Sequence, residues 1–351
     1  MSSLLLPDAL PAPRRPSPDS VPSLRWGVLG TGWIAERFVA ALQASTTQRV
    51  VAVGSRSEAS ARRFAASAGP EHAHGTHEAL VADPEVDIVY VATPHHVHLA
   101  SALLAIESGK HVLVEKPLGM NAAEAQAISK AASAAGVFCM EAMWTLFLPR
   151  ADVVRQVLEA GLLGDVRTVL ADHGEHFDPP HRILEPSMAG GALLDLGSYL
   201  TTLATWVLGP ASRVQASGEM TESGVNGQTA MLLTHAGGAT SVLHTTLRSR
   251  TPTSATIAGT AATLTLPGPF FQPGDVIVRS ADGSRAVTWT DPEPIGHGAL
   301  FHSALEAARC IGDGLLNSPL HPPESVVTAM LALDEVTRQV GVTYDRVPSH
   351  T

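Results

Sequence analysis

LRWGVLGTGWIAERFVAALQ, from Leu24 to Gln43, is the stretch of sequence that decides the fold. It reads as a short apolar run, a turn built on Gly30-Thr31-Gly32, and a segment whose apolar residues recur at helical spacing. A second apolar run, RVVAVGS, follows within a short distance. Strand, glycine turn, helix and strand in this order predict the start of a doubly wound parallel sheet that binds a dinucleotide.

The glycine turn fits the pattern G-x-G-x-x-G/A with Gly30, Gly32 and Ala35. The first glycine makes the tight turn, and the second lets a pyrophosphate approach the backbone N–H groups at the start of the helix. Taken alone, such a motif is also compatible with a turn that binds no ligand. In its strand–helix context we expect these residues to contact the cofactor: Gly30, Thr31, Gly32, Trp33 and Ile34.

The end of the second strand indicates which cofactor is bound. An acid at this point usually bonds the adenosine ribose 2′-hydroxyl of NAD, but here the chain has Ser55 and Arg56. A hydroxyl and a guanidinium suit a ribose 2′-phosphate, which an aspartate would repel. The sequence therefore favours NADP over NAD, although Arg56 also opens a surface helix and the alternative is a solvated side chain.

Further strands and helices continue the alternation: VDIVYVAT, HVLVE and VFCME read as strands with helical segments between them. Ligands of such sheets bind beyond the carboxyl ends of the strands. Several side chains with possible roles in binding occupy these ends: Thr93, Pro94, Glu115, Lys116 and Glu141.

Past Arg150 the pattern changes to half-buried antiparallel strands separated by glycine-rich turns. Seven stretches show this pattern: VRTVLADHGEHF, RVQASGEM, TAMLLTHAG, TSVLHTTLRS, ATLTL, DVIVRS and RAVTWT. One helix is expected over 192–208 and two near the C-terminus. We therefore predict a disordered tail rich in proline and serine over residues 1–23, a Rossmann domain over 24–142, and an α+β substrate-binding and oligomerisation domain with a large open sheet over 143–351.

Composition excludes several classes of protein. The 351 residues are 45% hydrophobic, and 33 acidic residues outnumber 23 basic ones, so nucleic acid is not an expected partner. No apolar run is long enough to span a membrane. Cys139 and Cys310 show neither disulfide nor metal spacing, which indicates a cytoplasmic protein.

One histidine-rich segment resembles a metal site. It contains His173, Glu175, His176, Asp178 and His181. His173 and His176 would point to opposite faces of a strand, however, and Pro179-Pro180 breaks the segment. Hydride transfer to a nicotinamide also needs no metal, so the sequence predicts none.

The sequence resembles a known family at this point. The glycine turn, TPHHVHLASALLAIESGKHVLVEKP, EAMWTLFLP and GGALLDLGSYL are similar, in order and spacing, to the glucose-fructose oxidoreductase, inositol dehydrogenase and MocA family. Within it the chain is most similar to the dihydrodiol dehydrogenase and NADP-dependent xylose dehydrogenase branch. The resemblance implies a second domain with a large, mostly antiparallel sheet, and it implies that Tyr199 and Lys116 are catalytic. It also implies that the Lys116–Pro117 bond is cis, which would aim the ammonium group at the ligand.

Substrate contacts are expected from a further group of residues. His98 and Arg182 correspond to pocket residues of the family, and His98 also lies near the expected cofactor contacts. Asp195, one turn before Tyr199, is expected to hold a substrate hydroxyl or tune the phenol, and the face of Trp144 is suited to stacking on a sugar ring. Ala189 stands where relatives usually have a first glycine.

These observations predict an NADP-dependent oxidoreductase that acts on a hydroxyl of a sugar, such as an aldose converted to a lactone, or of a cyclic diol. A phenol with a pKa near 10 is a poor base, and a nearby ammonium favours its ionised form. Two alternatives remain: a dinucleotide-binding sensor without turnover, and an enzyme that cleaves glycosides with nicotinamide assistance. The open sheet predicts a homodimer or homotetramer.

Overall fold

The computed structural model of the chain describes residues 6–344. The chain forms two compact units. The first, which we call the parallel-sheet unit, consists of Pro16–Phe147 and His297–Val327. The second, the antiparallel-sheet unit, consists of the residues up to Arg15, Leu148–Gly296 and the residues from Thr328 onward. The units differ from the predicted domains, because the chain does not divide once after residue 142: a later segment returns to the parallel-sheet unit.

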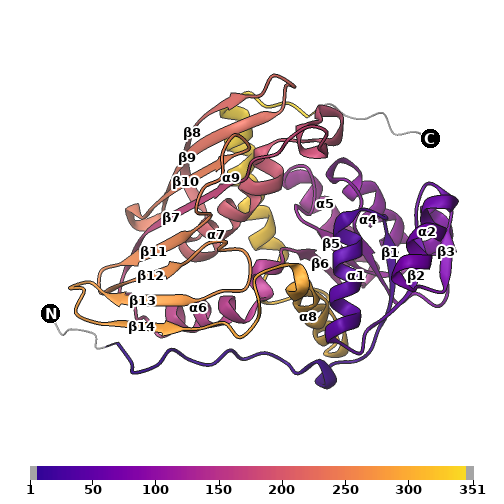
Figure 1. The fold of residues 1–351 in the computed structure, drawn as a ribbon, viewed down its shortest axis with the longest axis horizontal. Helices are drawn as coiled ribbons and strands as arrows, with labels where there is room; N and C mark the ends of the chain where they lie inside the picture. The colour runs from indigo at the N-terminus through magenta and orange to yellow at the C-terminus, as the bar shows by residue number, and fades with distance from the viewer. Residues whose placement is uncertain (1–5, 345–351) are drawn as a thin grey trace. The chain divides into compact units, whose positions relative to one another are not determined.

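The parallel-sheet unit contains a six-stranded sheet in the order β3-β2-β1-β4-β5-β6, with every neighbouring pair parallel. This order is that of a doubly wound dinucleotide-binding sheet and confirms the predicted Rossmann fold. The strands are β1 (Arg25–Leu29), β2 (Arg49–Gly54), β3 (His72–His74), β4 (Ile88–Val91), β5 (His111–Glu115) and β6 (Cys139–Ala142). The helices are α1 (Trp33–Ser45), α2 (Glu58–Ala68), α3 (His77–Val81), α4 (His98–Glu107), α5 (Ala122–Ala135) and α8 (Phe301–Gly312). Figure 1 shows α1, α2, α4 and α5 beside the strands of this sheet.

Local chemistry sets the limits of these helices. The side chains of Ser57, Thr76 and Asn121 each accept a hydrogen bond from a backbone N–H in the first turn of α2, α3 and α5. Gly69 and Gly136 end α2 and α5 in the left-handed conformation that glycine adopts without a steric penalty. Strand β4 is buried along its whole length, as expected of a strand covered on both faces.

The antiparallel-sheet unit contains an eight-stranded sheet in the order β14-β13-β12-β11-β7-β10-β9-β8. Only β7 and β10 pair in parallel, so the sheet is mostly antiparallel, as predicted. The strands are β7 (Val166–Gly174), β8 (Ala211–Met220), β9 (Asn226–His235), β10 (Thr240–Thr246), β11 (Ala255–Gly259), β12 (Ala262–Leu266), β13 (Val276–Ser280) and β14 (Ala286–Trp289). The remaining helices are α6 (Pro149–Glu159), α7 (Ser198–Leu208) and α9 (Pro323–Gln339).

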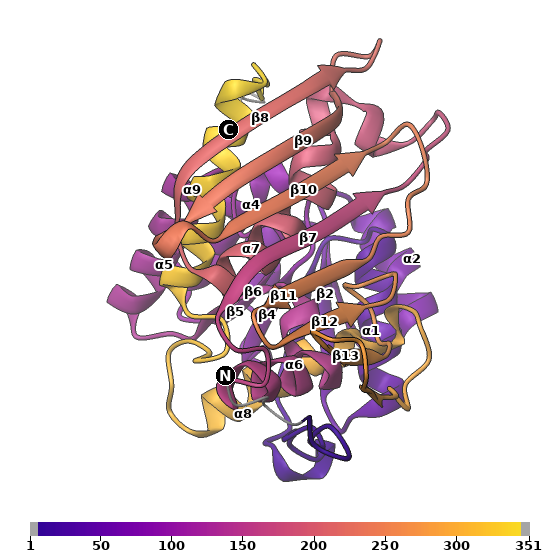
Figure 2. The same cartoon turned by 90° about the vertical axis from the view of Figure 1, so that its left-hand side faces the viewer.

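Helix α7 packs on one face of this sheet, against β7 and β10. Figure 2 shows the opposite face in front, with α7 behind the strands. Along β7 the side chains alternate, with Val169 buried and Leu170 exposed, and β10 repeats the pattern with Leu243 and Val242. The sheet therefore has a covered face and an open face. None of the helices in residues 6–344 combines the length and the apolar character required to cross a bilayer.

The N-terminal segment differs from the predicted disordered tail. In its described part, residues 6–23, Leu6 and Leu10 are buried. The backbone N–H and guanidinium of Arg14 bond the Asp152 carboxylate at 2.6 and 3.0 Å, and the guanidinium also reaches Glu159. Composition predicted disorder because few apolar residues are present, but Arg14 ties the part before Pro16 to α6 of the antiparallel-sheet unit.

Candidate active site

The glycine turn after β1 has the geometry that a dinucleotide requires. Gly30 has a φ of +107°, and a Cβ on it would lie 2.5 Å from the carbonyl oxygen of Ala92, so no other residue fits. Gly32 instead faces open space, with no atom within 4 Å of where its Cβ would stand. Ala35 is buried at the first turn of α1. The turn thus leaves room for a phosphate beside the first N–H groups of α1.

The loop after β2 carries Ser55 and the exposed Arg56. The backbone N–H of Ser55 donates to the carbonyl of His74 at 3.1 Å, which fixes the serine beside β3. Burial is the largest cause of the lowered pKa of His96, and the positive charge of Arg56 lowers it further. The same two causes act on His77, where Glu78 opposes them. The end of β2 therefore carries a guanidinium and no acid in the position that binds a ribose hydroxyl.

His98 begins α4 and joins the loops that follow β4 and β5. Its Nε2 lies 2.9 Å from the carbonyl oxygen of Thr93, and its Nδ1 lies 2.8 Å from that of Pro117. The ring is fully buried, and burial lowers its pKa to about 4. A neutral imidazole has one N–H, so it donates to one of the two carbonyls at a time. Both ring nitrogens are thus occupied by the backbone beside Pro94 and Lys116.

The Glu115-Lys116-Pro117 turn is fixed from both sides. Glu115 accepts hydrogen bonds from the Tyr90 hydroxyl and from the backbone N–H of Lys116, and burial raises the pKa of its carboxyl. The Lys116–Pro117 bond is cis, as the resemblance implied. Beyond the proline, the N–H of Leu118 donates to a buried carboxylate.

That carboxylate belongs to Glu141, at the end of β6. Its Oε1 accepts from Leu118 at 2.7 Å, and its Oε2 lies 2.7 Å from Nε2 of His321. Both side chains are buried. Sequence reasoning placed Glu141 at a strand end but did not identify His321, because nothing local indicates that a segment so distant along the chain returns to this point.

Trp144 lies in a short 3₁₀ helix after β6. Its buried ring stacks on His297, with ring centres 5.5 Å apart, and His297 also contacts Trp33 at the start of α1, at 4.7 Å between ring centres. The three rings belong to the parallel-sheet unit. The sequence predicted an aromatic face at Trp144 but not the histidine that covers part of it.

In the antiparallel-sheet unit, Asp195 and Arg182 form a two-point ion pair. Nη2 and Nη1 of the guanidinium lie 2.7 and 3.3 Å from the two carboxylate oxygens. Asp195 is buried, whereas about half of the Arg182 side chain is exposed. Asp195 stands in a π-helical turn, Leu193–Gly197, that precedes α7. Just before it, Ala189 adopts a φ of +53°, a conformation that suits the glycine of relatives better.

Tyr199 lies in the first turn of α7, and its ring is buried against other aromatic rings. Phe271 is 4.8 Å away between ring centres and His173 is 5.6 Å away. His173 in turn stacks on Phe271 and contacts Glu175 through Nε2 at 2.9 Å. The sequence showed Tyr199 as a candidate, but the neighbouring Phe271 comes from a loop with no motif.

Arg150 holds that loop. The guanidinium bonds five backbone carbonyls at 2.7 to 3.3 Å: those of Pro267, Pro269, Phe270, Gln272 and Asp275. The side chain is 2% exposed, and burial lowers its pKa to about 10. Arg150 thereby fixes the backbone that carries Phe271 against Tyr199.

Comparison with known proteins shows which family the chain belongs to. The family model described as an oxidoreductase family with an NAD-binding Rossmann fold matches residues 24–143, and the GFO/IDH/MocA C-terminal domain model matches residues 152–265. The trans-1,2-dihydrobenzene-1,2-diol dehydrogenase of Macaca fascicularis is 34% identical over 332 residues, which are 92% of this chain and 98% of the relative. The human protein of that name is 32% identical, with the same coverage.

Solved structures share the fold. KijD10, a 3-ketoreductase from Actinomadura kijaniata solved with NADP and TDP-benzene, has a TM-score of 0.79 and 27% identity, covering 91% of this chain and 98% of that one. A levoglucosan dehydrogenase solved with NADH and levoglucosan has a TM-score of 0.82 and 19% identity, with the same coverage. The family models, which together match most of the chain, and the relatives above 30% identity carry the assignment. The chain belongs to the GFO/IDH/MocA family of oxidoreductases.

Proposed function

We propose that this oxidoreductase uses NADP and transfers a hydride between the nicotinamide and a hydroxyl-bearing carbon of a sugar or a cyclic diol. The residues at the end of β2 are our reason for proposing NADP. Arg56 and Ser55 stand where an acid would favour NAD, and the charge of Arg56 acts on the imidazoles of His77 and His96. KijD10, at 27% identity, was solved with NADP. The curated relatives, named for a dihydrodiol, support a diol or sugar substrate.

The residues present fit a dinucleotide. Gly32 leaves open space beside the N-terminus of α1, and Gly30 allows the close approach of the chain to Ala92. We therefore propose that the turn from Gly30 to Ile34 binds the pyrophosphate, that Ser55 and Arg56 bind the ribose phosphate, and that Thr93 and Pro94 line the nicotinamide side. Glu115 supports this side by holding the backbone of Lys116.

Tyr199 and Lys116 are the proposed catalytic pair. A bound nicotinamide would accept the hydride from the substrate carbon or return it. Tyr199 takes the hydroxyl proton as the hydride leaves, and its aromatic neighbours keep the phenol fixed. The Lys116 ammonium favours the phenolate and stabilises negative charge on the reacting oxygen. Glu115 holds the backbone N–H of Lys116, and Glu141 holds that of Leu118 just beyond the proline.

The substrate contacts proposed here are Asp195, Arg182 and Trp144. The Asp195 carboxylate would accept a hydrogen bond from a substrate hydroxyl, and Arg182 bonds this carboxylate at two points. We propose that the Trp144 ring contacts the apolar side of the substrate ring. Because both ring nitrogens of His98 contact backbone carbonyls, we assign it a positioning role between the Thr93 and Pro117 loops instead of a direct contact.

The first experiment is an absorbance assay at about 340 nm, where reduced nicotinamide absorbs, with NADP or NAD and a panel of aldoses, inositols and cyclic diols. We expect turnover with NADP. Tyr199→Phe and Lys116→Met should each lose about 100-fold or more in kcat while binding NADPH normally. Ser284→Ala, a substitution in a β-turn of the same unit as Tyr199, is the control and should keep full activity.

Each contrary result has a defined meaning. Near-normal kcat in both variants would contradict the proposed pair. Preference for NAD would contradict the role of Ser55 and Arg56. Absence of turnover with every compound of the panel, while NADPH still binds, would favour a dinucleotide-binding sensor. Release of an aglycone with no net consumption of cofactor would favour glycoside cleavage.

The open face of the eight-stranded sheet supports a homodimer. Leu170, Val242 and Leu232 lie directly opposite one another on β7, β10 and β9 and are 45%, 50% and 39% exposed. A contiguous apolar row of this kind on a sheet face is typical of an interface. We propose that two copies pair through it, with a dimer of dimers as the larger alternative. Light scattering should then give twice the mass of one chain.

We also propose that the protein works in the reducing cytoplasm. Cys139 and Cys310 are both buried and unpaired, as in proteins that do not depend on oxidation for their stability. Full activity in the presence of a thiol reductant would agree with this assignment, whereas a requirement for an oxidised cysteine would contradict it.

A further inference from the structure

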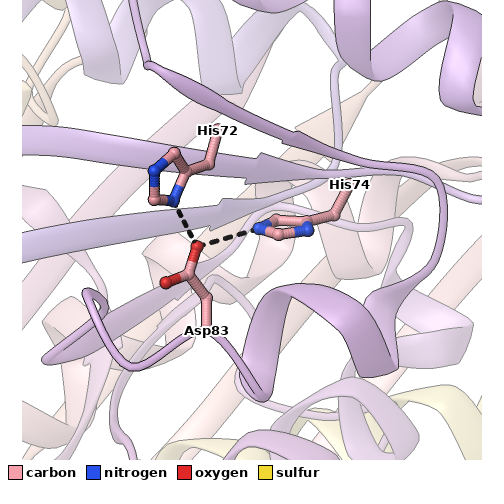
Figure 3. Close-up of side chains that lie close together, drawn as sticks. All are labelled: His72, His74 and Asp83. Atoms are coloured by element: carbon pink, nitrogen blue, oxygen red, sulfur yellow. Dashed lines mark hydrogen bonds and ion pairs between the residues drawn. The ribbon is translucent and has the colours of Figure 1, made fainter.

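We propose that His72, His74 and Asp83 form a binding site for one divalent transition metal ion of the Zn²⁺ class. Figure 3 shows the two imidazole rings on one strand, both turned toward the carboxylate. One ligand atom of each residue lies within 4.8 Å of the other two. This inference does not depend on the proposed reaction, and no motif in the sequence indicated it.

The fold brings the three side chains together at the outer edge of the six-stranded sheet. His72 and His74 are two residues apart on β3, so their side chains leave the same face of the strand, while β3 pairs with β2 on its inner side. Asp83 follows the end of α3, where its N–H donates to the carbonyl of Leu80. The two histidines are therefore held by a strand, and the backbone of Asp83 by a hydrogen bond to the last turn of α3, before any ion binds.

The ligand atoms are close to the geometry of a bound ion. Nδ1 of His72 and Nε2 of His74 lie 2.6 and 2.9 Å from the same oxygen, Oδ2 of Asp83. Bonds of about 2.0–2.2 Å to a tetrahedral Zn²⁺ would place ligand atoms roughly 3.3 Å apart. A movement of the carboxylate by about half an ångström reaches that spacing. The ion would take the place of the two protons that now bridge the rings and the oxygen.

The carboxylate has the orientation expected of a metal ligand with outer support. Oδ1 of Asp83 accepts the backbone N–H of Glu85 at 2.9 Å, which leaves Oδ2 directed at the two rings. Lys110 donates to the backbone carbonyl oxygens of Asp83 and Val86, both at 2.8 Å, and so fixes the loop without occupying the carboxylate.

Solvent access and charge also favour a cation here. The Asp83 side chain is 3% exposed, whereas His72 and His74 are 41% and 23% exposed, so water can reach an ion and complete its coordination. The negative charges of Glu71 and Glu85 act on His72 in the same direction as that of Asp83. Two imidazoles and one carboxylate suit Zn²⁺, Co²⁺, Ni²⁺ or Cu²⁺ better than Mg²⁺ or Ca²⁺.

The site lies away from the proposed reaction. It is on β3 at one edge of the sheet, and Lys116 follows β5, which is separated from β3 by β2, β1 and β4. The sequence predicted no metal site, and the histidines considered for one were those of 173–181. An ion at His72 and His74 would instead join β3 to the loop between α3 and β4.

The test is a Co²⁺ titration of tag-free protein that has been dialysed against a chelator, followed by competition with Zn²⁺. We expect one equivalent of Co²⁺ to bind with the intense visible absorption of tetrahedral coordination, and Zn²⁺ to displace it. His72→Gln and His74→Gln should each weaken binding by about 100-fold or more, since they remove a ligand outright. Having two separate variants protects the test against one that fails to fold.

The matched control is His176→Gln. Nε2 of His176 lies 3.3 Å from Oδ1 of Asp178, an exposed imidazole–carboxylate pair that is not part of any three-residue ligand group within residues 6–344. This variant should bind Co²⁺ like the parent chain. The proposal is overturned if the folded parent chain binds no equivalent of Co²⁺ or Zn²⁺ at millimolar concentration, or if the two ligand variants retain the affinity of the control.

Discussion

Replacing Arg150 by methionine should destabilise the antiparallel-sheet unit by about 3 kcal/mol. The four protons on the two terminal nitrogens serve five carbonyls, and hydrogen bonds from a charged donor contribute about 1.5 kcal/mol each, or about 6 kcal/mol together. Burial of the charge opposes this. Burial lowers the pKa of the guanidinium to about 10, which corresponds to an unfavourable free energy of about 3 kcal/mol. The difference, a net stabilisation of about 3 kcal/mol, is what the substitution should remove.

The assay is urea unfolding followed by circular dichroism, with the free energy of unfolding extrapolated to water. Arg167→Met is the matched control. Its guanidinium donates to one carbonyl, that of Gly237 at 3.2 Å, and contacts Asp165, but the side chain is 53% exposed. The control should change the free energy of unfolding by less than about 0.5 kcal/mol. If Arg150→Met stays within about 1 kcal/mol of the parent chain, the carbonyl bonds do not hold the loop as described.

Three further predictions concern acid stability, the cofactor and assembly. The pKa of His98 is lowered to about 4 in the folded chain, whereas in the unfolded chain the imidazole takes up a proton near pH 6.5. The stability attributable to this residue is therefore present above pH 6.5 and is lost as the pH falls toward 4. The stability advantage of the parent chain over His98→Gln should shrink by about 2–3 kcal/mol between pH 7 and 4.5; a constant difference would refute the burial argument. Arg56→Ala should raise the Kd of NADPH by about 10- to 100-fold and leave that of NADH unchanged in fluorescence titrations, whereas Arg62→Ala, on the surface of α2, should alter neither; equal losses for the two cofactors would contradict a phosphate contact. Val242→Glu should give a monomer by light scattering and Val242→Thr should not, and a Val242→Glu dimer would place the interface elsewhere.

The parallel-sheet unit could be predicted from sequence because its signals are local. The glycine turn, the apolar strands and the caps each lie within a few residues of what they determine, and a strand order of this kind follows from right-handed crossovers. The position of Lys116 at the end of β5 follows from the same logic. Two strands were missed. β3 is only three residues long, HAH, and β11 is ATIAG, whose alanine and glycine give a weak strand signal until β7 and β12 pair with it.

The details of the candidate site needed contacts between distant parts of the chain. Asp195 and Tyr199 were expected to share a helical face, but Asp195 stands in a π-helical turn, where the spacing of side chains differs from that of an α-helix. Asp195 and Arg182 were each predicted as a substrate contact, whereas the structure also joins them in an ion pair. His297 and His321 reach Trp144 and Glu141 only through the returning C-terminal segment, which no local pattern reveals.

The five hydrogen bonds from Arg150 all end on main-chain carbonyls, so they do not depend on the side chains of the loop. A loop whose path is set through its backbone keeps that path when its side chains are exchanged. Exchange of the buried Phe270 or Phe271 would therefore alter the packing beside Tyr199, while the main chain keeps its path through the carbonyls that Arg150 binds.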